Sequence, residues 1–122
     1  MMGININDKH YPFTELILDG IKTIETRKTP SLNPYIGKRV GIIRTGKGKA
    51  MLVGFMTIGE PIRYESEEQF RGDEDKHCVV KGSKYDIDIQ GKWGYPISNP
   101  VRVKPRYVTN KGIVARKLTY GG

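Results

Sequence analysis

Apolar residues at helical spacing mark one amphipathic helix near the start of the chain. Phe13, Leu16 and Ile17 recur at this spacing with polar residues between them, which predicts a helix over Tyr11–Asp19 with one face on a core. We expect Gly20 to end the helix, because glycine adopts the left-handed conformation that closes a helix at little cost.

The remaining apolar stretches are short and are bounded by glycine and proline, which is typical of strands joined by turns. The predicted strands are Ile4–Asn7, Lys38–Arg44, Ala50–Ile58 with a continuation over Thr57–Tyr64, Tyr95–Val103 and Gly112–Leu118, and Thr23–Arg27 is an extended segment. Alternation in Met51, Val53 and Phe55 predicts a sheet with one buried face. The acidic stretch Glu65–Lys76 predicts one or two short helices.

These elements predict an α+β fold, in which roughly five or six short strands form a small mixed β-barrel with a few short helices. Closure of such a barrel would leave no sheet edge exposed. Neither a repeat nor a linker divides the 122 residues, so we expect one domain over residues 1–122.

Composition favours a soluble, cytoplasmic protein. The chain is 37% apolar and 28% charged, a globular balance, and its N-terminus lacks the basic and apolar regions of a secretion signal. No apolar run reaches the roughly 20 residues that a membrane span needs, so no membrane association is expected. Cys78 is the only cysteine, which excludes an intrachain disulfide and suits a reducing compartment, and we expect a small half-buried core residue.

Charge is unevenly distributed along the chain, with a formal net charge of +8. Residues 26–59 and 89–122 carry only basic charges, whereas acids gather between Glu60 and Asp75. If the fold joins the basic segments, their field favours polyanions such as RNA, with strong salt dependence. The alternative is that the lysines serve solubility alone.

Several common kinds of site are excluded by their missing residues. His10 and His77 are too few and too far apart in the sequence for a metal site, and no cofactor is expected. A serine, histidine and acid arrangement with familiar local context is absent. The glycine-rich loop Thr45–Lys49 lacks the spacing of a Walker phosphate loop.

One segment carries a recognisable motif. Gly20–Arg27 matches the pattern Gly-x-Lys-x-x-Glu-x-Arg, follows the predicted helix and precedes Gly37-Lys38-Arg39-Val40, a Gly-x-x-Val strand start. Further matches are Gly48–Gly54, as a second barrel strand, and Gly94–Pro100, as a late strand ending in Asn-Pro. In these features the chain resembles ASCH domains of the PUA-like superfamily, from about Ile4 to Leu118. The resemblance implies a PUA-like pseudobarrel with helices at its ends, and RNA as the usual ligand.

The motif supplies the first candidate site residues. Strand alternation places Glu25 and Arg27 on one face, where they can pair, and Lys22 on the other. The pair is either a structural ion pair or a functional one, with Arg27 on a phosphate or base edge and Glu25 orienting it or accepting a base amine. Lys22, just past the helix, is expected to be a mobile ammonium that neutralises a phosphate or, if desolvated, acts as a base or activates a nucleophile.

Further candidates come from other segments. Lys47 and Lys49 on the glycine-rich loop, with Arg44 at its base, could contact the same strand of nucleic acid or form a solvated hairpin tip. Trp93 or Tyr95, but not both, could stack on an unpaired base, although an aromatic residue at a strand start is more often part of the core. Ser98 could donate to a base or cap a turn.

Three functions remain open. The first is an RNA-binding module with a basic cleft for single-stranded RNA or a nucleotide, serving RNA processing or translation. The second is an enzyme that acts on RNA or a modified nucleoside, with Lys22 and Glu25 as catalytic residues. Some ASCH proteins resemble amidohydrolases of acetylcytidine that use a lysine, a threonine and a later glutamate, but Glu25 stands at the threonine position, whereas a ribonuclease could use the carboxylate. The third is a domain whose basic cleft meets an acidic protein partner.

Overall fold

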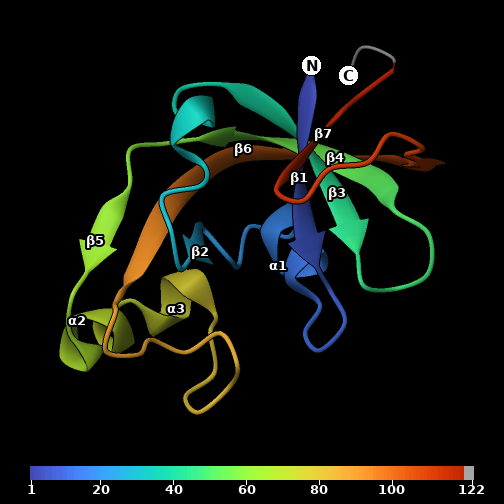
Figure 1. Ribbon diagram of the computed structural model, residues 1–122. Helices are drawn as coiled ribbons and strands as arrows, with labels where there is room; N and C mark the ends of the chain where they lie inside the picture. Colours follow the sequence, from blue (N-terminus) through green and yellow to red (C-terminus); the bar gives the residue numbers. More distant parts are fainter. Residues whose placement is uncertain (120–122) are drawn as a thin grey trace.

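A curled mixed sheet organises residues 1–119, the part of the chain that this computed structural model describes (Figure 1). In chain order the elements are β1 (Met2–Asn7), α1 (Phe13–Leu18), β2 (Ile24–Arg27), the 3-10 helix η1 (Asn33–Tyr35), β3 (Arg39–Thr45), β4 (Met51–Ile58), β5 (Ile62–Tyr64), α2 (Glu67–Gly72), α3 (Glu74–His77), β6 (Lys92–Tyr107) and β7 (Ala115–Lys117). The predicted α+β class is confirmed. Strand β6 is longer than expected and β7 is shorter.

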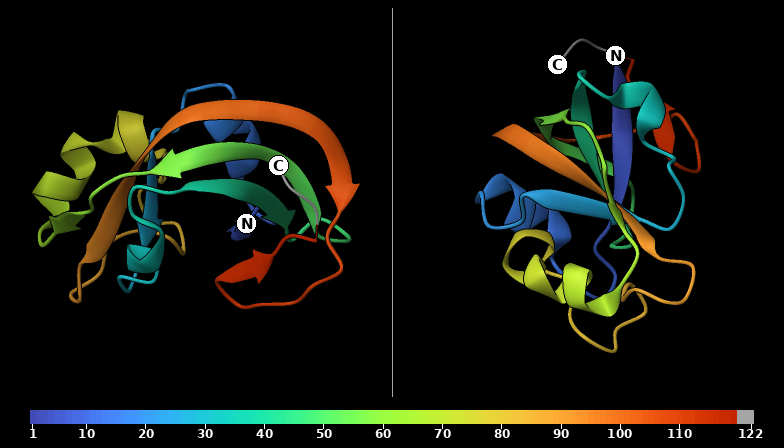
Figure 2. Two further views of the ribbon diagram at one scale, coloured as in Figure 1. Left: turned by 90° about the horizontal axis from the view of Figure 1, so that it is seen from above. Right: turned by 90° about the vertical axis from the view of Figure 1, so that its left-hand side faces the viewer.

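The sheet is a half-barrel built around β6. Its strand order is β2-β6-β4-β3-β1-β7, with β5 also on β6, and all pairs are antiparallel except β1 with β3. The first part of β6 pairs with β2 and β5 and the rest pairs with β4, so this strand arches over the molecule (Figure 2). Among the described residues the end strands β2 and β7 do not pair with each other, so the expected full closure of the barrel is wrong.

Irregular pairing supplies the curvature. The register between β4 and β6 shifts twice, between Leu52 and Gly54 and between Phe55 and Thr57. Asn99 in β6 has a φ of 49°, which asparagine tolerates better than most residues. A Cβ at Gly54 would overlap the Val101 carbonyl oxygen, so glycine permits the close approach of β4 and β6 there.

Both faces of β3 and β4 are buried, contrary to the single buried face that we predicted. In β4, Val53 and Met56 join the main core with α1, whereas Leu52 and Phe55 pack with Leu118 on the other face. The nearly continuous apolar sequence of β4 reflects this two-sided burial.

The helix α1 forms where the apolar spacing predicted it, and Asp8 holds its start. The Asp8 carboxylate accepts hydrogen bonds from the Thr14 backbone N–H at 3.0 Å and from the Thr14 hydroxyl at 2.5 Å. Gly20 has a φ of 74° and directly follows Asp19, the C-cap, as expected.

The acidic stretch forms α2 and α3, as predicted, and these helices cover one end of the sheet beside β5 (Figure 1). Tyr64, Phe70 and Val79 form a separate apolar cluster beneath them. Arg71 bonds to the Val79 carbonyl oxygen at 3.0 Å and to Asp86 at 2.8 Å, which anchors the loop of residues 79–91. Cys78 is half-buried, as predicted. Over residues 1–119, every helix is too short or too polar to cross a membrane.

Candidate functional site

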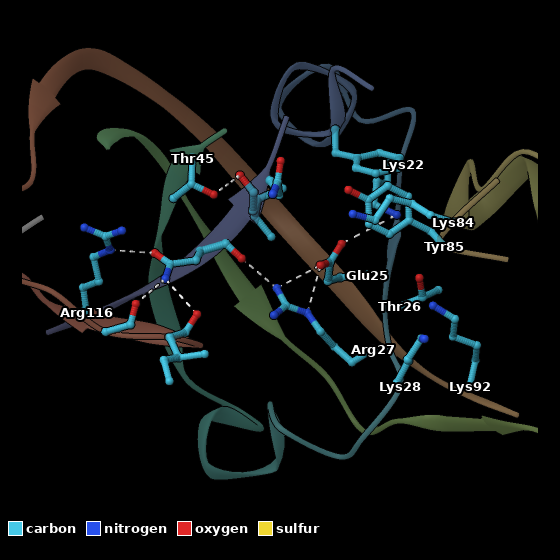
Figure 3. A pocket seen from close by; sticks show the side chains of 16 residues that line it. Lys22, Glu25, Thr26, Arg27, Lys28, Thr45, Lys84, Tyr85, Lys92 and Arg116 are labelled. Carbon is cyan, nitrogen blue, oxygen red and sulfur yellow. Dashed lines mark hydrogen bonds and ion pairs between the residues drawn. The ribbon is translucent and has the colours of Figure 1, made fainter. Parts of the chain in front are cut away.

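A cavity of about 550 Å³ opens between the start of the sheet and the loop of residues 79–91 (Figure 3). Its walls come from β1, the first residue of α1, the turn after α1, β2, the end of β3, this loop, the start of β6, β7 and the segment that precedes β7. The lining residues are Asn5, Ile6, Asn7, Phe13, Lys22, Glu25, Thr26, Arg27, Lys28, Thr45, Lys84, Tyr85, Lys92, Gly112, Ile113 and Arg116.

Glu25 lies at the centre of a buried charge cluster. Its Oε2 accepts a hydrogen bond from Arg27 Nε at 3.0 Å and lies 2.9 Å from Arg27 Nη2, and its Oε1 lies 3.7 Å from Lys22 Nζ. The Glu25 side chain is 10% exposed and that of Lys22 only 1%. The predicted pairing of Glu25 with Arg27 is confirmed, and one carboxylate serves two cations.

Lys22 is fixed, so the expectation of a mobile ammonium is wrong, and the lysine is instead desolvated, which was the condition set for its role as a base or activator. Its Nζ donates to the carbonyl oxygens of Ile24 at 2.8 Å and His77 at 2.5 Å and lies 4.8 Å from the Phe13 ring centroid. Burial lowers the pKa of Lys22, although the Glu25 carboxylate opposes the shift. These contacts leave the ammonium poorly placed to reach out to a phosphate.

The geometry of the motif's glycine explains where Lys22 points. Gly20 adopts its left-handed φ just before Ile21 and Lys22, whose backbone N–H groups both donate to the Leu16 carbonyl oxygen at 2.9 Å. Lys22 therefore belongs to the turn that closes α1 and precedes the first residue of β2. Strand alternation does not apply to it, so Lys22 shares a side with Glu25.

His77 supports this cluster from behind. The ring is fully buried and stacks on Phe70 with centroids 3.9 Å apart. Its Nδ1 accepts from the Val79 backbone N–H at 2.9 Å, which leaves Nε2 to donate to the Phe70 carbonyl oxygen at 2.7 Å. Burial lowers the pKa of His77, so the neutral ring is favoured. Its role is structural, through the carbonyl oxygen that holds Lys22.

Asn5 connects the charge cluster to the segment before β7. Its carbonyl oxygen accepts from Arg27 Nη2 at 2.8 Å. Its Nδ2 donates to the Gly112 and Ile113 carbonyl oxygens at 2.9 and 3.0 Å, and its Oδ1 accepts from Arg116 Nε at 3.0 Å. Asn5 thus links Arg27 to Arg116, and Figure 3 shows Glu25, Arg27 and Arg116 along this chain of hydrogen bonds.

Four further cations line the cavity around this network. Lys28, Lys84, Lys92 and Arg116 join Lys22 and Arg27, and Glu25 is the one carboxylate among the described lining residues. Lys92 is only 3% exposed, and its pKa is lowered first by burial and then by the charge of Lys28.

The aromatic candidates do not line the cavity. Tyr95 is fully buried in the core and its hydroxyl donates to Asn33 Oδ1 at 2.7 Å, so of the two aromatic candidates Tyr95 is the one that turns inward and cannot stack on a base. Trp93 is half-buried beneath Arg63, whose guanidinium carbon lies 5.0 Å from the ring. Stacking of Trp93 on a base stays a prediction, but such a base would lie outside the cavity.

The candidates on β3, its hairpin and the middle of β6 also lie away from the cavity. Arg44 is half-buried beside Thr45, which does line the cavity, and Lys47 and Lys49 are exposed at the hairpin tip. Lys49 Nζ lies 5.4 Å from the Tyr107 ring centroid. Ser98 is exposed beside a separate cavity of about 30 Å³. The expected single site thus joins Lys22, Glu25 and Arg27 and leaves these four outside.

Sequence reasoning missed several lining residues, above all Tyr85, Lys92 and Arg116. Lys92 and Arg116 stood in the acid-free C-terminal run, so charge gave a signal, but no motif distinguished them from other lysines and arginines there. Tyr85 lies on an irregular loop, where no periodicity indicates direction. No group of three or more metal-ligating side chains occurs within residues 1–119.

Comparison with known proteins identifies the fold. Neither a protein-family model nor a curated protein matches the sequence. The crystal structure of ASCH from Zymomonas mobilis aligns with a TM-score of 0.71 at 16% identity, covering 88% of this chain and 73% of that one. This chain has the ASCH fold. Crystal structures of two single-residue variants of the same protein give TM-scores of 0.69 and 0.70 at 16% identity, over 87% and 88% of this chain and 72% and 75% of theirs.

The ASCH fold is a PUA-like pseudobarrel, so the fold prediction made from the motif is confirmed. At this level of identity the likeness extends to the fold alone.

Proposed function

We propose that the chain is an ASCH-family domain that binds single-stranded RNA or a nucleotide in the cavity around Glu25. The observation that carries the proposal is the lining, in which six cationic side chains surround one carboxylate that already has two cationic neighbours. Such a surplus of positive charge in a confined space attracts phosphates.

The dimensions suit a single nucleotide. Cavities that hold small ligands usually enclose about 300–1,000 Å³, and this one encloses about 550 Å³. Phe13 and Tyr85 provide aromatic surface for a base, with ring centroids 5.4 Å apart. An unpaired base is required, because bases within a duplex cannot enter a cavity of this kind.

A salt series tests the proposal directly. Fluorescence anisotropy of a short, labelled, single-stranded oligoribonucleotide would report affinity, with a duplex of the same sequence for comparison. Each cation that neutralises a phosphate contributes about 0.7 to the slope of log affinity against log salt for single strands. We therefore expect Lys84→Ala to weaken binding and to reduce this slope by about 0.7.

Lys104→Ala is the matched control, because Lys104 is exposed on β6 outside the cavity and its loss changes the net charge equally. Absence of binding at low salt, or equal effects of the two substitutions, would reject the cavity as the RNA site. Displacement of bound RNA by an acidic protein is the result that would favour the protein-partner alternative instead.

A second candidate, an enzyme acting on RNA or a modified nucleoside, is supported by Lys22. Its desolvated amine stands 3.7 Å from Glu25, and a lowered pKa brings a lysine closer to acid-base or nucleophile-activating chemistry. For an amidohydrolase of the acetylcytidine type, Glu25 replaces the threonine and removes the hydroxyl nucleophile. A ribonuclease agrees better with a carboxylate here. Incubation with RNA and with acetylcytidine decides: turnover must occur and must disappear in Lys22→Met.

A further inference from the structure

Two lysines without a carboxylate partner meet at the end of the cavity between β2 and β6. Lys28 follows the last residue of β2, and Lys92 is the first residue of β6. The antiparallel register pairs Arg27 with Trp93, so the next residues, Lys28 and Lys92, come together across the two strands. Figure 3 shows both side chains beside Thr26, on the opposite side of the Glu25–Arg27 pair from Arg116.

Both amines are free of direct partners within the described chain. No hydrogen bond or ion pair of residues 1–119 engages the Lys28 ammonium, the Lys92 ammonium or the Thr26 hydroxyl. Lys92 nevertheless is 97% removed from solvent, being 3% exposed, and it lines the cavity. Burial of the residue partly desolvates the Lys92 ammonium, which is unfavourable, and so are like charges opposite each other on adjacent strands.

An anion in this corner would relieve both costs at once. It would give the Lys92 ammonium a partner in a poorly hydrated place, where charge-assisted hydrogen bonds are strong. It would also turn the repulsion between Lys28 and Lys92 into joint attraction. The Thr26 hydroxyl, which is also half-buried here, supplies a neutral donor between them.

We propose that Lys28, Lys92 and the Thr26 hydroxyl form a phosphate subsite of the cavity, so that its ligand is a phosphorylated nucleotide, free or within RNA, and not a bare nucleoside. This deepens the proposed function and rests on it. With the phosphate in this corner, the nucleoside extends past Glu25 toward the aromatic wall. There the Tyr85 hydroxyl is buried without a hydrogen-bond partner in residues 1–119 and can serve an acceptor on the ligand.

Paired ligands that differ only in a phosphate test the subsite. Isothermal titration calorimetry would compare each nucleoside 5′-monophosphate with its nucleoside, and inorganic phosphate alone would be the smallest probe. We expect the natural protein to prefer the monophosphate by about tenfold or more, as a charge-assisted hydrogen bond implies. Lys92→Met and Lys28→Met should each remove most of this preference, whereas Lys104→Met should leave it unchanged.

Lys28 is exposed, so Lys28→Met does not depend on whether the buried Lys92→Met variant folds. Circular dichroism checks the fold of both, and Thr26→Val gives a further variant without a charge change. The inference is overturned if monophosphate and nucleoside bind equally well, or if the preference persists in the Lys28→Met and Lys92→Met variants.

Oligonucleotides separate the sources of the phosphate and separate the inference from the proposed function. If Lys92→Met weakens an oligonucleotide only when it carries a terminal phosphate, the subsite holds a terminal phosphate; if it weakens both forms, the subsite holds an internal one. If RNA binds but Lys92→Met and Lys28→Met have no effect on it, the subsite is refuted while the proposed function survives. If neither RNA nor any nucleotide binds, the proposed function itself fails.

Proton uptake provides a readout that a merely structural role would not produce. The charges that act on Lys92 are Lys28, Glu25, Asp88 and Lys22, and burial and the two lysines lower its pKa while the two acids raise it. A bound phosphate raises the pKa again, so binding should take up protons in the pH range between the Lys92 pKa of the free protein and the higher pKa of the complex. Calorimetry in two buffers of different ionisation enthalpy measures this uptake, which Lys92→Met should lower.

Discussion

Replacing Glu25 with glutamine measures how strongly the charge cluster of the site is coupled to the fold. Glutamine keeps the shape and can still accept from Arg27, but it removes the charge that both Lys22 and Arg27 share. The charge of Lys22 would be stabilised least in this variant, because the side chain is 1% exposed to water and its hydrogen bonds go to neutral carbonyl oxygens. Removal of one partner from a buried ion pair typically costs about 3–5 kcal/mol, so we expect about 3 kcal/mol of lost stability.

Urea unfolding, followed by Trp93 fluorescence and far-UV circular dichroism, gives the free energy of unfolding in each variant. Glu74→Gln is the control, because its carboxylate pairs with Arg71 at 2.7 Å but is 50% exposed. An exposed pair contributes about 0–1 kcal/mol, and Arg71 retains Asp86 in that variant. If Glu25→Gln costs no more than Glu74→Gln, the cluster is not stabilised by the charge of Glu25 and our reasoning is refuted.

The pH dependence of this cost has a definite sign. The pKa of Lys22 in the folded protein lies below its ordinary 10.5, so the unfolded chain binds more protons and stability rises as pH increases between the two values. Loss of the Glu25 charge removes the main influence that raises the Lys22 pKa, so this window extends to lower pH in the variant. The stability deficit of Glu25→Gln should therefore shrink as the solution is made more alkaline, and a deficit that grows would contradict this account.

Two predictions concern the scaffold. Gly54→Ala places a Cβ against the Val101 carbonyl oxygen and the Leu18 side chain and should cost about 1–3 kcal/mol in the same urea assay, whereas Gly72→Ala, with nothing within 4 Å, should be neutral or stabilise by about 0.4–1 kcal/mol. Tyr64→Phe removes the hydrogen bond of 2.6 Å from a fully buried hydroxyl to Asp73 and should cost about 1.5 kcal/mol of unfolding free energy. An unchanged urea midpoint would show that water satisfies Asp73 equally well.

Local patterns predicted the elements well because the determinants of those elements are local. The spacing of Phe13 and Ile17 placed α1, and the punctuation by glycine and proline placed most strands. Local patterns could not predict the curvature of the sheet. The curvature depends on β6, which continues through Pro96 and Pro100 and changes partners along its length. Which strands share β6 is decided by long-range pairing, which no periodicity records.

The candidate site was predictable only where one segment supplied it. Glu25 and Arg27 belong to one strand, so alternation was sufficient to pair them. Lys22 was placed on the wrong side because it belongs to the turn after α1, where the rule for strands does not hold. Lys28 and Lys92 stand far apart in the sequence, and only the register between β2 and β6 brings them together.

The same contacts explain why the cavity can be preformed in the absence of a ligand. Arg27 and Lys22 are held by Glu25 and by backbone carbonyl oxygens, so they define the floor of the cavity and have few hydrogen-bond donors left to offer. Lys28 and Lys92 have no such hydrogen-bond or ion-pair partners within residues 1–119, so their ammonium groups can engage a ligand. Lys22 and Arg27 therefore serve the stability of the fold, whereas Lys28 and Lys92 serve ligand binding, and substitutions should affect the two properties separately. Loss of Glu25 should act first on unfolding, whereas loss of Lys28 should act on ligand affinity with little effect on the fold.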